Sequence, residues 1–279
     1  MSLTGKKIRM KRLIDEHNAC IICALDHGMT SRDFLDPLAN MPKLVGEAVK
    51  GGANVFMLAR NYASICASEF KKDTSLAFML TATTARNPSD NLTTEIGSVE
   101  EALRFGADAV VVYVALATGH DKYTVELVAR VGAECEALGL PFIAEAEYPN
   151  IYMPKGEQKK FGGDYLIYNA RICAELGADI IKTNWPEDQE GFARIVRAVC
   201  PIPVVVAGGH KTSDMELLER MEQGVSAGAV GCSVGRNIFL HQNPFAITRA
   251  LSRVIREKWK AKEAMEELEE ELKKQGPGN

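Results

Sequence analysis

The chain has 279 residues, of which 46% are hydrophobic and 25% charged, and its formal net charge is −4. A chain of this size and composition suits one large globular domain or two small ones, and it can bury a sizeable core without disulfide bonds. The acidic balance excludes a nucleic-acid footprint, which needs a basic patch or stripe. No signal peptide opens the chain and no apolar run approaches the ~20 residues of a membrane helix, so we expect a cytoplasmic protein with neither membrane nor nucleic-acid partners.

The first expected element is an N-terminal arm over residues 1–18, which covers one mouth of the domain described next. Eight short apolar runs rich in Val, Ile and Leu follow within residues 19–256. Near-continuous apolarity is typical of strands buried on both faces of a parallel sheet. The runs begin near Ile21, Asn54, Ser75, Ala109, Pro141, Asp179, Pro203 and Ala229.

Helical patterns separate these runs. Apolar residues fall on one helical face within residues 44–49, 125–132 and 217–221. Ser98 and Glu101 have the spacing of a capping box at the start of another helix.

Four junctions between a helix and the next run carry a Gly-Ala pair, beginning at Gly52, Gly106, Gly177 and Gly228. Helices often end on a glycine in the left-handed conformation, so the repeat indicates one βα unit used many times. Eight units predict an α/β protein of the (β/α)8 TIM-barrel class. The alternative is a doubly wound open sheet, but residues 25–28 lack its glycine-rich first turn.

The chain ends with residues 257–279, of which 257–274 predict a highly charged helix supported by i,i+4 pairs. This helix could pack on a neighbouring subunit or lie in solvent. We expect residues 275–279 to be disordered.

Seven cysteines, an odd number, indicate reduced thiols. Cys20 and Cys23 form a C-x-x-C pattern inside an apolar run, where buried structural thiols are favoured over a redox pair.

Barrel enzymes place their chemistry at the carboxyl ends of the strands. Lys182 interrupts the sixth apolar run. Burial there would lower the pKa of the lysine, and the neutral amine is a nucleophile for a carbonyl. The alternative is a lysine that reaches solvent from the end of the strand.

Two other strand ends carry acid or base groups. Asp26 follows the first run and can relay a proton or orient the lysine, although it could also cap a turn. Tyr148 follows the fifth run after Glu145 and Glu147. Its phenol can act as a general acid or base if a nearby cation lowers its pKa, and a packing role is the alternative.

The seventh and eighth runs end in glycine-bearing loops that contain Gly208, Gly209, Gly235 and Arg236. Backbone amides exposed by glycine can cradle a phosphate, and an adjacent arginine adds a charge-assisted fork. Barrel enzymes often bind phosphate in these two loops, although tight turns without a ligand would read the same way. Together with the lysine, the loops predict that Lys182 forms an imine with a small phosphorylated sugar or ketone. The C–C bond next to the imine carbon can then break or form.

At these residues the sequence resembles the archaeal-type class I fructose-bisphosphate aldolases of the DhnA-like family. That family also includes 2-amino-3,7-dideoxy-D-threo-hept-6-ulosonate synthase and a thiolase that processes phosphorylated autoinducer-2. The matching stretches are Leu25-Asp26-His27-Gly28, GSVEEALRFGADA from Gly97, ELGADIIKTN from Glu175, PVVVAGG from Pro203 and VGRNIF from Val234.

The resemblance implies a Schiff-base role for Lys182, an acid/base role for Tyr148 and an assisting role for Asp26. It places Gly208, Gly209, Gly235 and Arg236 on phosphate-binding positions. It also implies substrate contacts at His27, Asn184 and Arg86, no cofactor or metal, and a homo-oligomer, with a decamer among the expected forms. The chain departs from the family at Asn150, where an arginine is usual, and over residues 81–91, so a specialised substrate is expected.

The first prediction is therefore a Schiff-base aldolase for a phosphorylated ketose such as fructose 1,6-bisphosphate. The heptulosonate synthase and a thiolase acting on a phosphorylated diketone are alternatives of the same class. A metal-dependent aldolase is weakly supported, because the five histidines form no H-x-x-x-H pair. A non-catalytic phosphosugar-binding barrel would keep the glycine loops but would not need the lysine.

Overall fold

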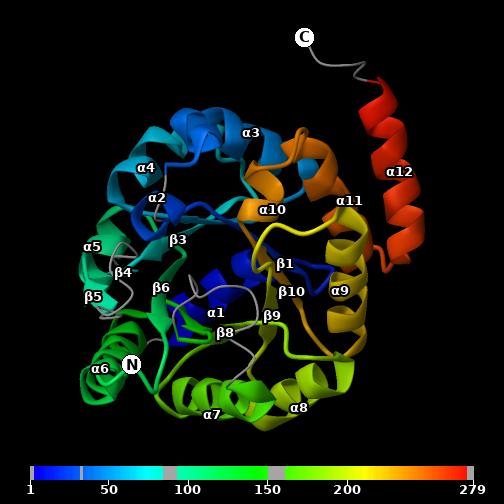
Figure 1. Ribbon diagram of the computed structural model, residues 1–279. Coiled ribbons are helices and arrows are strands. Elements are labelled where there is room, and N and C mark those ends of the chain that lie inside the picture. The colour runs from blue at the N-terminus through cyan, green and yellow to red at the C-terminus, as the bar shows by residue number, and fades with distance from the viewer. Residues whose placement is uncertain (1–2, 32–33, 84–92, 150–160, 275–279) are drawn as a thin grey trace.

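A computed structural model describes residues 3–31, 34–83, 93–149 and 161–274. Eight parallel strands close into a barrel in the order β1-β10-β9-β8-β7-β6-β3-β2 (Figure 1). The eight predicted runs are these eight strands, so the (β/α)8 prediction is confirmed. The barrel strands are β1 (Cys20–Ala24), β2 (Val55–Leu58), β3 (Ser75–Met79), β6 (Ala109–Val114), β7 (Phe142–Ala146), β8 (Ile180–Thr183), β9 (Val204–Ala207) and β10 (Gly231–Val234).

Helices surround the strands as an outer ring (Figure 1). Its members are α3 (Met41–Gly51), α4 (Arg60–Ile65), α5 (Val99–Arg104), α6 (Asp121–Leu138), α7 (Gly162–Glu175), α8 (Gln189–Val199), α9 (Asp214–Ser226) and α11 (Pro244–Arg256). Short helices α2 (His27–Thr30) and α10 (Arg236–Phe239) follow β1 and β10, and 3-10 turns span Asp36–Asn40 and Ala67–Glu69.

The predicted helix signals lie where the sequence placed them. All four junction glycines, Gly52, Gly106, Gly177 and Gly228, have positive φ values of 105°, 76°, 102° and 105°. A residue with a Cβ rarely adopts this conformation, which explains the repeated glycine. The Ser98 side chain accepts a hydrogen bond from the Glu101 amide at 3.1 Å, as the capping box predicts.

Side chains alternate along each strand between the barrel interior and the layer beneath the helices. On β7, Ile143 faces the interior cluster, whereas Phe142 and Ala144 join the outer core. On β8, Ile180 faces inward and Ile181 outward. This alternation decides which residues at the strand ends can reach the barrel mouth.

Helix α1 (Leu3–Leu13) lies at the amino-terminal end of the strands, behind the barrel in Figure 1. Leu13 is fully buried in the interior cluster. The Asn54 side chain donates to the Leu13 carbonyl at 3.0 Å, and its oxygen accepts the Ile21 amide at 2.8 Å. The helix therefore closes the mouth opposite to the carboxyl ends of the strands.

Helix α12 (Ala261–Lys274) is the charged C-terminal helix, and it packs on α9 and α11 outside the ring (Figure 1). It buries Ala261, Ala264 and Leu268 in the outer core. The helix is thus neither free in solvent nor dependent on a neighbouring subunit for its apolar face. Residues 275–279 lie outside the described residues.

A two-stranded hairpin, β4 (Thr81–Thr83) with β5 (Thr93–Glu95), was not predicted. The segment joining its strands, which includes Arg86, lies outside the described residues. Within the described ranges, no helix is long and apolar enough to cross a membrane.

Candidate active site

Lys182 lies on β8 at the carboxyl mouth of the barrel, and its side chain faces inward. The parallel register of β7 and β8 places Glu145 directly beside Lys182. The Lys182 ammonium donates a hydrogen bond to Glu145 Oε1 and forms an ion pair with Glu147 Oε1 at 3.2 Å. The three residues are only 8%, 4% and 5% exposed. A cation between two buried carboxylates is therefore the central feature of the site.

The period of two along β7 explains why both glutamates face the lysine. Residues 143, 145 and 147 share the inward face, whereas residues 144, 146 and 148 face the helices. Asn169 on α7 fixes the end of this strand, because its amide donates to the carbonyls of Val114 at 2.9 Å and Glu147 at 3.0 Å.

The charges of this cluster set its protonation. Burial alone would lower the pKa of Lys182, but the negative charges of Glu145, Glu147 and Asp26 outweigh burial and raise that pKa. The predicted lowering of the lysine pKa is therefore wrong. Burial, together with Glu147 and Asp26, raises the pKa of Glu145 to about 7 despite the neighbouring ammonium.

Asp26 and His27 enter the same pocket from the end of β1. The His27 Nδ1 atom lies 3.5 Å from Asp26 Oδ1, and the His27 ring packs edge-on against Phe239 with centroids 5.1 Å apart. Burial lowers the pKa of His27 to about 4. The negative charge of Asp26 raises this pKa, whereas the positive charges of Arg236 and Lys182 lower it further. His27 is therefore a neutral imidazole at pH 7.

Tyr148 faces away from the lysine pocket and does not line it. Its ring stacks on Tyr165 with centroids 5.9 Å apart, and its hydroxyl donates to the Gly162 carbonyl at 3.4 Å. Burial raises the pKa of Tyr148, so the predicted lowering by a cation is wrong. Tyr148 lines an adjoining hollow, which shares Asn184 with the lysine pocket.

The phenol that does line the lysine pocket is Tyr113, which sequence reasoning missed. It occupies an inward position of β6, and its hydroxyl donates to the Tyr148 carbonyl at 2.9 Å. The signal was available, because Tyr113 is the polar interruption of an otherwise apolar run, as Lys182 is.

The two glycine loops meet beside the lysine pocket, and both line it. A Cβ added to Gly235 would lie 2.5 Å from His27 Cε1 and 2.6 Å from the Ala24 carbonyl oxygen, so only glycine fits there. Gly209 has a φ of 67°, which also favours glycine. A Cβ at Gly208 would lie 3.1 Å from a methyl group of Val234.

Asn237, another residue that sequence reasoning missed, joins these loops. It is fully buried, and its amide donates to the carbonyls of Gly208 at 3.2 Å and His210 at 3.0 Å. Its side-chain oxygen accepts the Thr212 amide at 2.9 Å. One side chain from the β10 loop thus fixes the course of the β9 loop.

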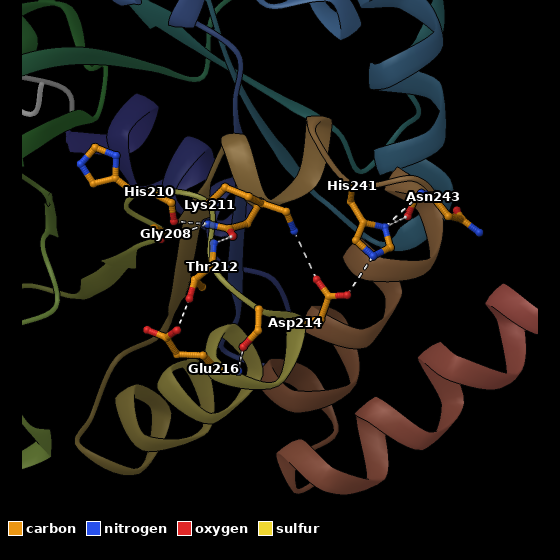
Figure 2. A network of polar contacts seen from close by, with 10 residues as sticks. Gly208, His210, Lys211, Thr212, Asp214, Glu216, His241 and Asn243 are labelled. Atoms are coloured by element: carbon orange, nitrogen blue, oxygen red, sulfur yellow. Dashed lines mark hydrogen bonds and ion pairs between the residues drawn. The ribbon is translucent and has the colours of Figure 1, made fainter. Parts of the chain in front are cut away.

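The far end of the β9 loop is held by a second network (Figure 2). The Asp214 carboxylate lies between Lys211, at 3.3 Å, and His241 Nε2, at 3.1 Å. His241 Nδ1 lies 2.8 Å from the Asn243 carbonyl oxygen and 3.0 Å from the Asn243 amide nitrogen, so the imidazole ring links Asp214 to the start of α11.

Two cations flank the glycine loops. Arg236 donates to His210 Nδ1 at 3.0 Å, and Arg220 donates to the Gly208 carbonyl at 3.3 Å. Burial lowers the pKa of Arg220, and Glu216 opposes that shift. Arg220 was not among the predicted residues.

Of the predicted site residues, the pocket collects Asp26, His27, Lys182, Asn184, Gly208, Gly209, Gly235 and Arg236. Arg86 and Asn150 lie outside the described residues. The Asn184 side-chain oxygen accepts the Tyr148 amide at 2.7 Å. Within the described part of the chain, no group of three or more His, Cys, Asp or Glu side chains could hold a metal ion.

These features, a closed eight-stranded barrel with an inward lysine beside two glycine loops, agree with a family match. The family model described as DeoC/LacD family aldolase matches residues 20–241. The chain therefore belongs to the DeoC/LacD aldolase family and is an enzyme of the carbon–carbon lyase class.

Two curated relatives are both named as a 2-amino-3,7-dideoxy-D-threo-hept-6-ulosonate synthase. The protein of Halobacterium salinarum is 31% identical over 255 residues, which cover 91% of this chain and 93% of the relative. A protein of Archaeoglobus fulgidus is 32% identical over 266 residues, covering 95% and 96%.

Solved structures show the same fold. An archaeal fructose 1,6-bisphosphate aldolase superposes with a TM-score of 0.79 at 25% identity, covering 90% of this chain and 99% of that one. A fructose-bisphosphate aldolase from Slackia heliotrinireducens gives 0.82 at 16% identity, covering 96% and 91%.

Proposed function

We propose that this enzyme forms a Schiff base between Lys182 and the carbonyl of a phosphorylated ketose, and breaks or forms the C–C bond beside it. The observation that carries the proposal is the position of the Lys182 amine. It lies in a buried pocket, and the same pocket is lined by both glycine loops. An amine and an anion cradle in one pocket suit a substrate with a carbonyl near a phosphate.

The binding roles follow from the chemistry of the lining. The loops at Gly208, Gly209 and Gly235 let a phosphate approach the backbone closely, and the Arg236 guanidinium supplies positive charge. His27, held neutral by burial, and Asn184 offer hydrogen bonds to substrate hydroxyls. The iminium formed at Lys182 is an electron sink for the electrons of the broken C–C bond.

Two substrates are supported by different relatives. The predicted substrate, fructose 1,6-bisphosphate, is that of the archaeal aldolase with the same fold. The heptulosonate synthase activity is supported by the relatives from Halobacterium salinarum and Archaeoglobus fulgidus, at 31% and 32% identity. Both reactions use the same lysine and the same anion cradle in this proposal, and they differ in the second half of the substrate.

Borohydride trapping tests the proposal. We expect a phosphorylated ketose plus borohydride to leave a stable adduct on Lys182, located by peptide mass spectrometry. Lys6 is an internal control, because it is also 8% exposed and also paired with two carboxylates, Glu136 and Asp179, but at the opposite end of the barrel. An adduct on neither lysine, or on both equally, would refute the Schiff-base assignment.

A coupled assay then separates the two substrates. Fructose 1,6-bisphosphate cleavage releases two triose phosphates, which accumulate without an added acceptor. If adduct forms but no triose phosphate is released, the synthase reaction is favoured.

The subunit number is a further part of the proposal. By resemblance we propose a homo-oligomer working in the cytoplasm, and sedimentation velocity at micromolar enzyme tests the oligomer. A single monomeric species would contradict it.

A further inference from the structure

We infer that Glu145 and Glu147, rather than Tyr148, carry protons between the Lys182 nitrogen and the substrate. The inference rests on the proposed Schiff base and adds the acid and base that this Schiff base needs. It differs from the role that the family resemblance implies for Tyr148.

The contacts of the nitrogen are the first argument. Glu145 accepts a hydrogen bond from Lys182 Nζ, and Glu147 lies 3.2 Å from the same atom. Proton transfer needs heavy atoms within hydrogen-bond reach, about 2.6–3.2 Å, or one bridging water. Both carboxylates meet this condition before a substrate binds.

The direction of the Tyr148 side chain is the second argument. Its backbone follows Glu147, so the strand alternation turns its ring towards the helices, where it stacks on Tyr165. Three contacts hold this segment: the Tyr148 amide on Asn184, the Tyr148 carbonyl on Tyr113, and the Glu147 carbonyl on Asn169. Bringing the phenol to Lys182 would require breaking them.

The proton balance of imine formation is the third argument. An ammonium and a ketone give a protonated imine and one water. One of the three ammonium protons stays on the nitrogen, and two leave with the carbonyl oxygen. No net proton enters or leaves the pocket, so an adjacent carboxylate can accept each proton from nitrogen and return it to oxygen. Glu145, in contact with the nitrogen, is suited to this transfer.

The C–C bond step needs a second base. This base removes the proton from the hydroxyl group on the carbon that leaves as an aldehyde. The electron pair of the broken C–C bond moves towards the iminium nitrogen, so that the iminium becomes an enamine. The same group, now an acid, returns its proton to the enamine carbon, and water then hydrolyses the iminium. Glu147 lies two residues closer to the carboxyl mouth than Glu145 and lines the same pocket, and we assign this step to it.

The neighbours support a carboxyl that titrates in the working range. The ionisable groups facing Glu145 are Lys182, Glu147 and Asp26, and the pocket also contains His27 and Tyr113. Burial and the negative charges of Glu147 and Asp26 raise the pKa of Glu145 to about 7, so this carboxyl, in contact with the Lys182 nitrogen, is partly protonated near neutral pH. A group that both accepts and donates a proton works best under this condition.

The test compares Glu145→Gln, Glu147→Gln and Glu187→Gln, the last an exposed carboxylate in the loop after β8. We measure the rate of borohydride-trappable adduct formation on Lys182 and the turnover rate, from pH 5.5 to 9. Removing a general acid or base typically costs about 100-fold or more. We expect Glu145→Gln to slow adduct formation by this factor and to lose the wild-type rise in rate near pH 7. We expect Glu147→Gln to form the adduct but to lose turnover, and Glu187→Gln to match the wild type.

A faster rather than slower rate of adduct formation in Glu145→Gln would overturn the inference. If the glutamates only held the ammonium, replacing Glu145 would lower the Lys182 pKa and speed adduct formation at pH 7. Adduct formation and turnover that survive both glutamate substitutions but are lost in Tyr148→Phe would also overturn it. Glu145→Asp, which keeps a carboxylate, should restore part of the rate, whereas a purely structural role would predict no rescue in folded protein. A wild-type enzyme that forms no adduct would refute the proposed function instead, and the inference with it.

Discussion

Replacing Lys182 by methionine should destabilise the protein, because it leaves the carboxylates of Glu145 and Glu147 buried without a cation. The ammonium is the cation that Glu145 and Glu147 contact directly, and all three side chains are buried. Removing one partner of a buried ion pair typically costs about 3–5 kcal/mol, because the other partner keeps its charge without compensation. We therefore expect Lys182→Met to lose activity and also stability.

The pH dependence of this loss follows from the carboxyl that remains. Burial and the other carboxylates already raise the pKa of Glu145 to about 7, and the ammonium is the group that opposes this shift. Without Lys182 the folded-state pKa rises further above its unfolded value of 4.5. A carboxyl with a raised folded-state pKa favours folding below its unfolded pKa, and this contribution is lost as the pH rises through the folded value. The deficit of Lys182→Met should therefore be large at pH 8 and small at pH 5.

Thermal melts at both pH values measure the effect. For a protein of this size 1 kcal/mol shifts the Tm by about 2 °C, so we expect a fall of roughly 6–10 °C at pH 8. The double variant Lys182→Met/Glu145→Gln should recover at least half of it. A single variant as stable as the wild type at pH 8, or a deficit unchanged at pH 5, would refute the buried-charge reasoning.

Two further predictions concern the β1 and β10 ends. His27 is neutral in the folded protein with a pKa of about 4, against 6.5 in the unfolded chain. Lowering the pH from 8 to 5 should therefore remove about 2 kcal/mol of unfolding free energy through this group. His27→Asn should flatten this part of the acid decline in urea melts, and an unchanged slope would contradict the assignment. Gly235→Ala places a methyl 2.6 Å from the Ala24 carbonyl oxygen, so we expect a loss of about 1–3 kcal/mol and a raised KM for the phosphorylated substrate. Gly28→Ala, whose Cβ would meet nothing within 4 Å, is the control and should be neutral in both assays.

The barrel could be predicted from the sequence because two independent signals agreed. Eight apolar runs predicted the strands. Four glycines with positive φ marked junctions between a helix and the next strand, at Gly52, Gly106, Gly177 and Gly228. The hairpin of β4 and β5 escaped because its strands have three residues each, too few to show a period. The packing of α12 escaped because only Ala261, Ala264 and Leu268 form its buried stripe among many charges.

The two glycine loops could be predicted because glycines that directly follow an apolar run are recognisable in the sequence. Asn237, which joins them, could not be found in this way. A buried asparagine is defined by the backbone groups that it satisfies, and these lie 25–29 residues away along the chain.

The error on the lysine has a physical reason. Burial and neighbouring charge shift a pKa in opposite directions, and the sequence shows burial but not which residues lie beside the lysine. The register of β7 against β8 shows the neighbouring charge, because it places Glu145 beside Lys182. Once the fifth strand is assigned, its period of two separates Glu145 and Glu147 on one face from Tyr148 on the other. The match of Tyr148 to a family motif gives only its position in the sequence. Proton transfer depends on which face of the strand the side chain occupies, and neighbouring residues of a strand occupy opposite faces. The glutamates are therefore the better candidates for acid/base chemistry at Lys182, since the strand that carries them would have to rearrange before the phenol could replace them.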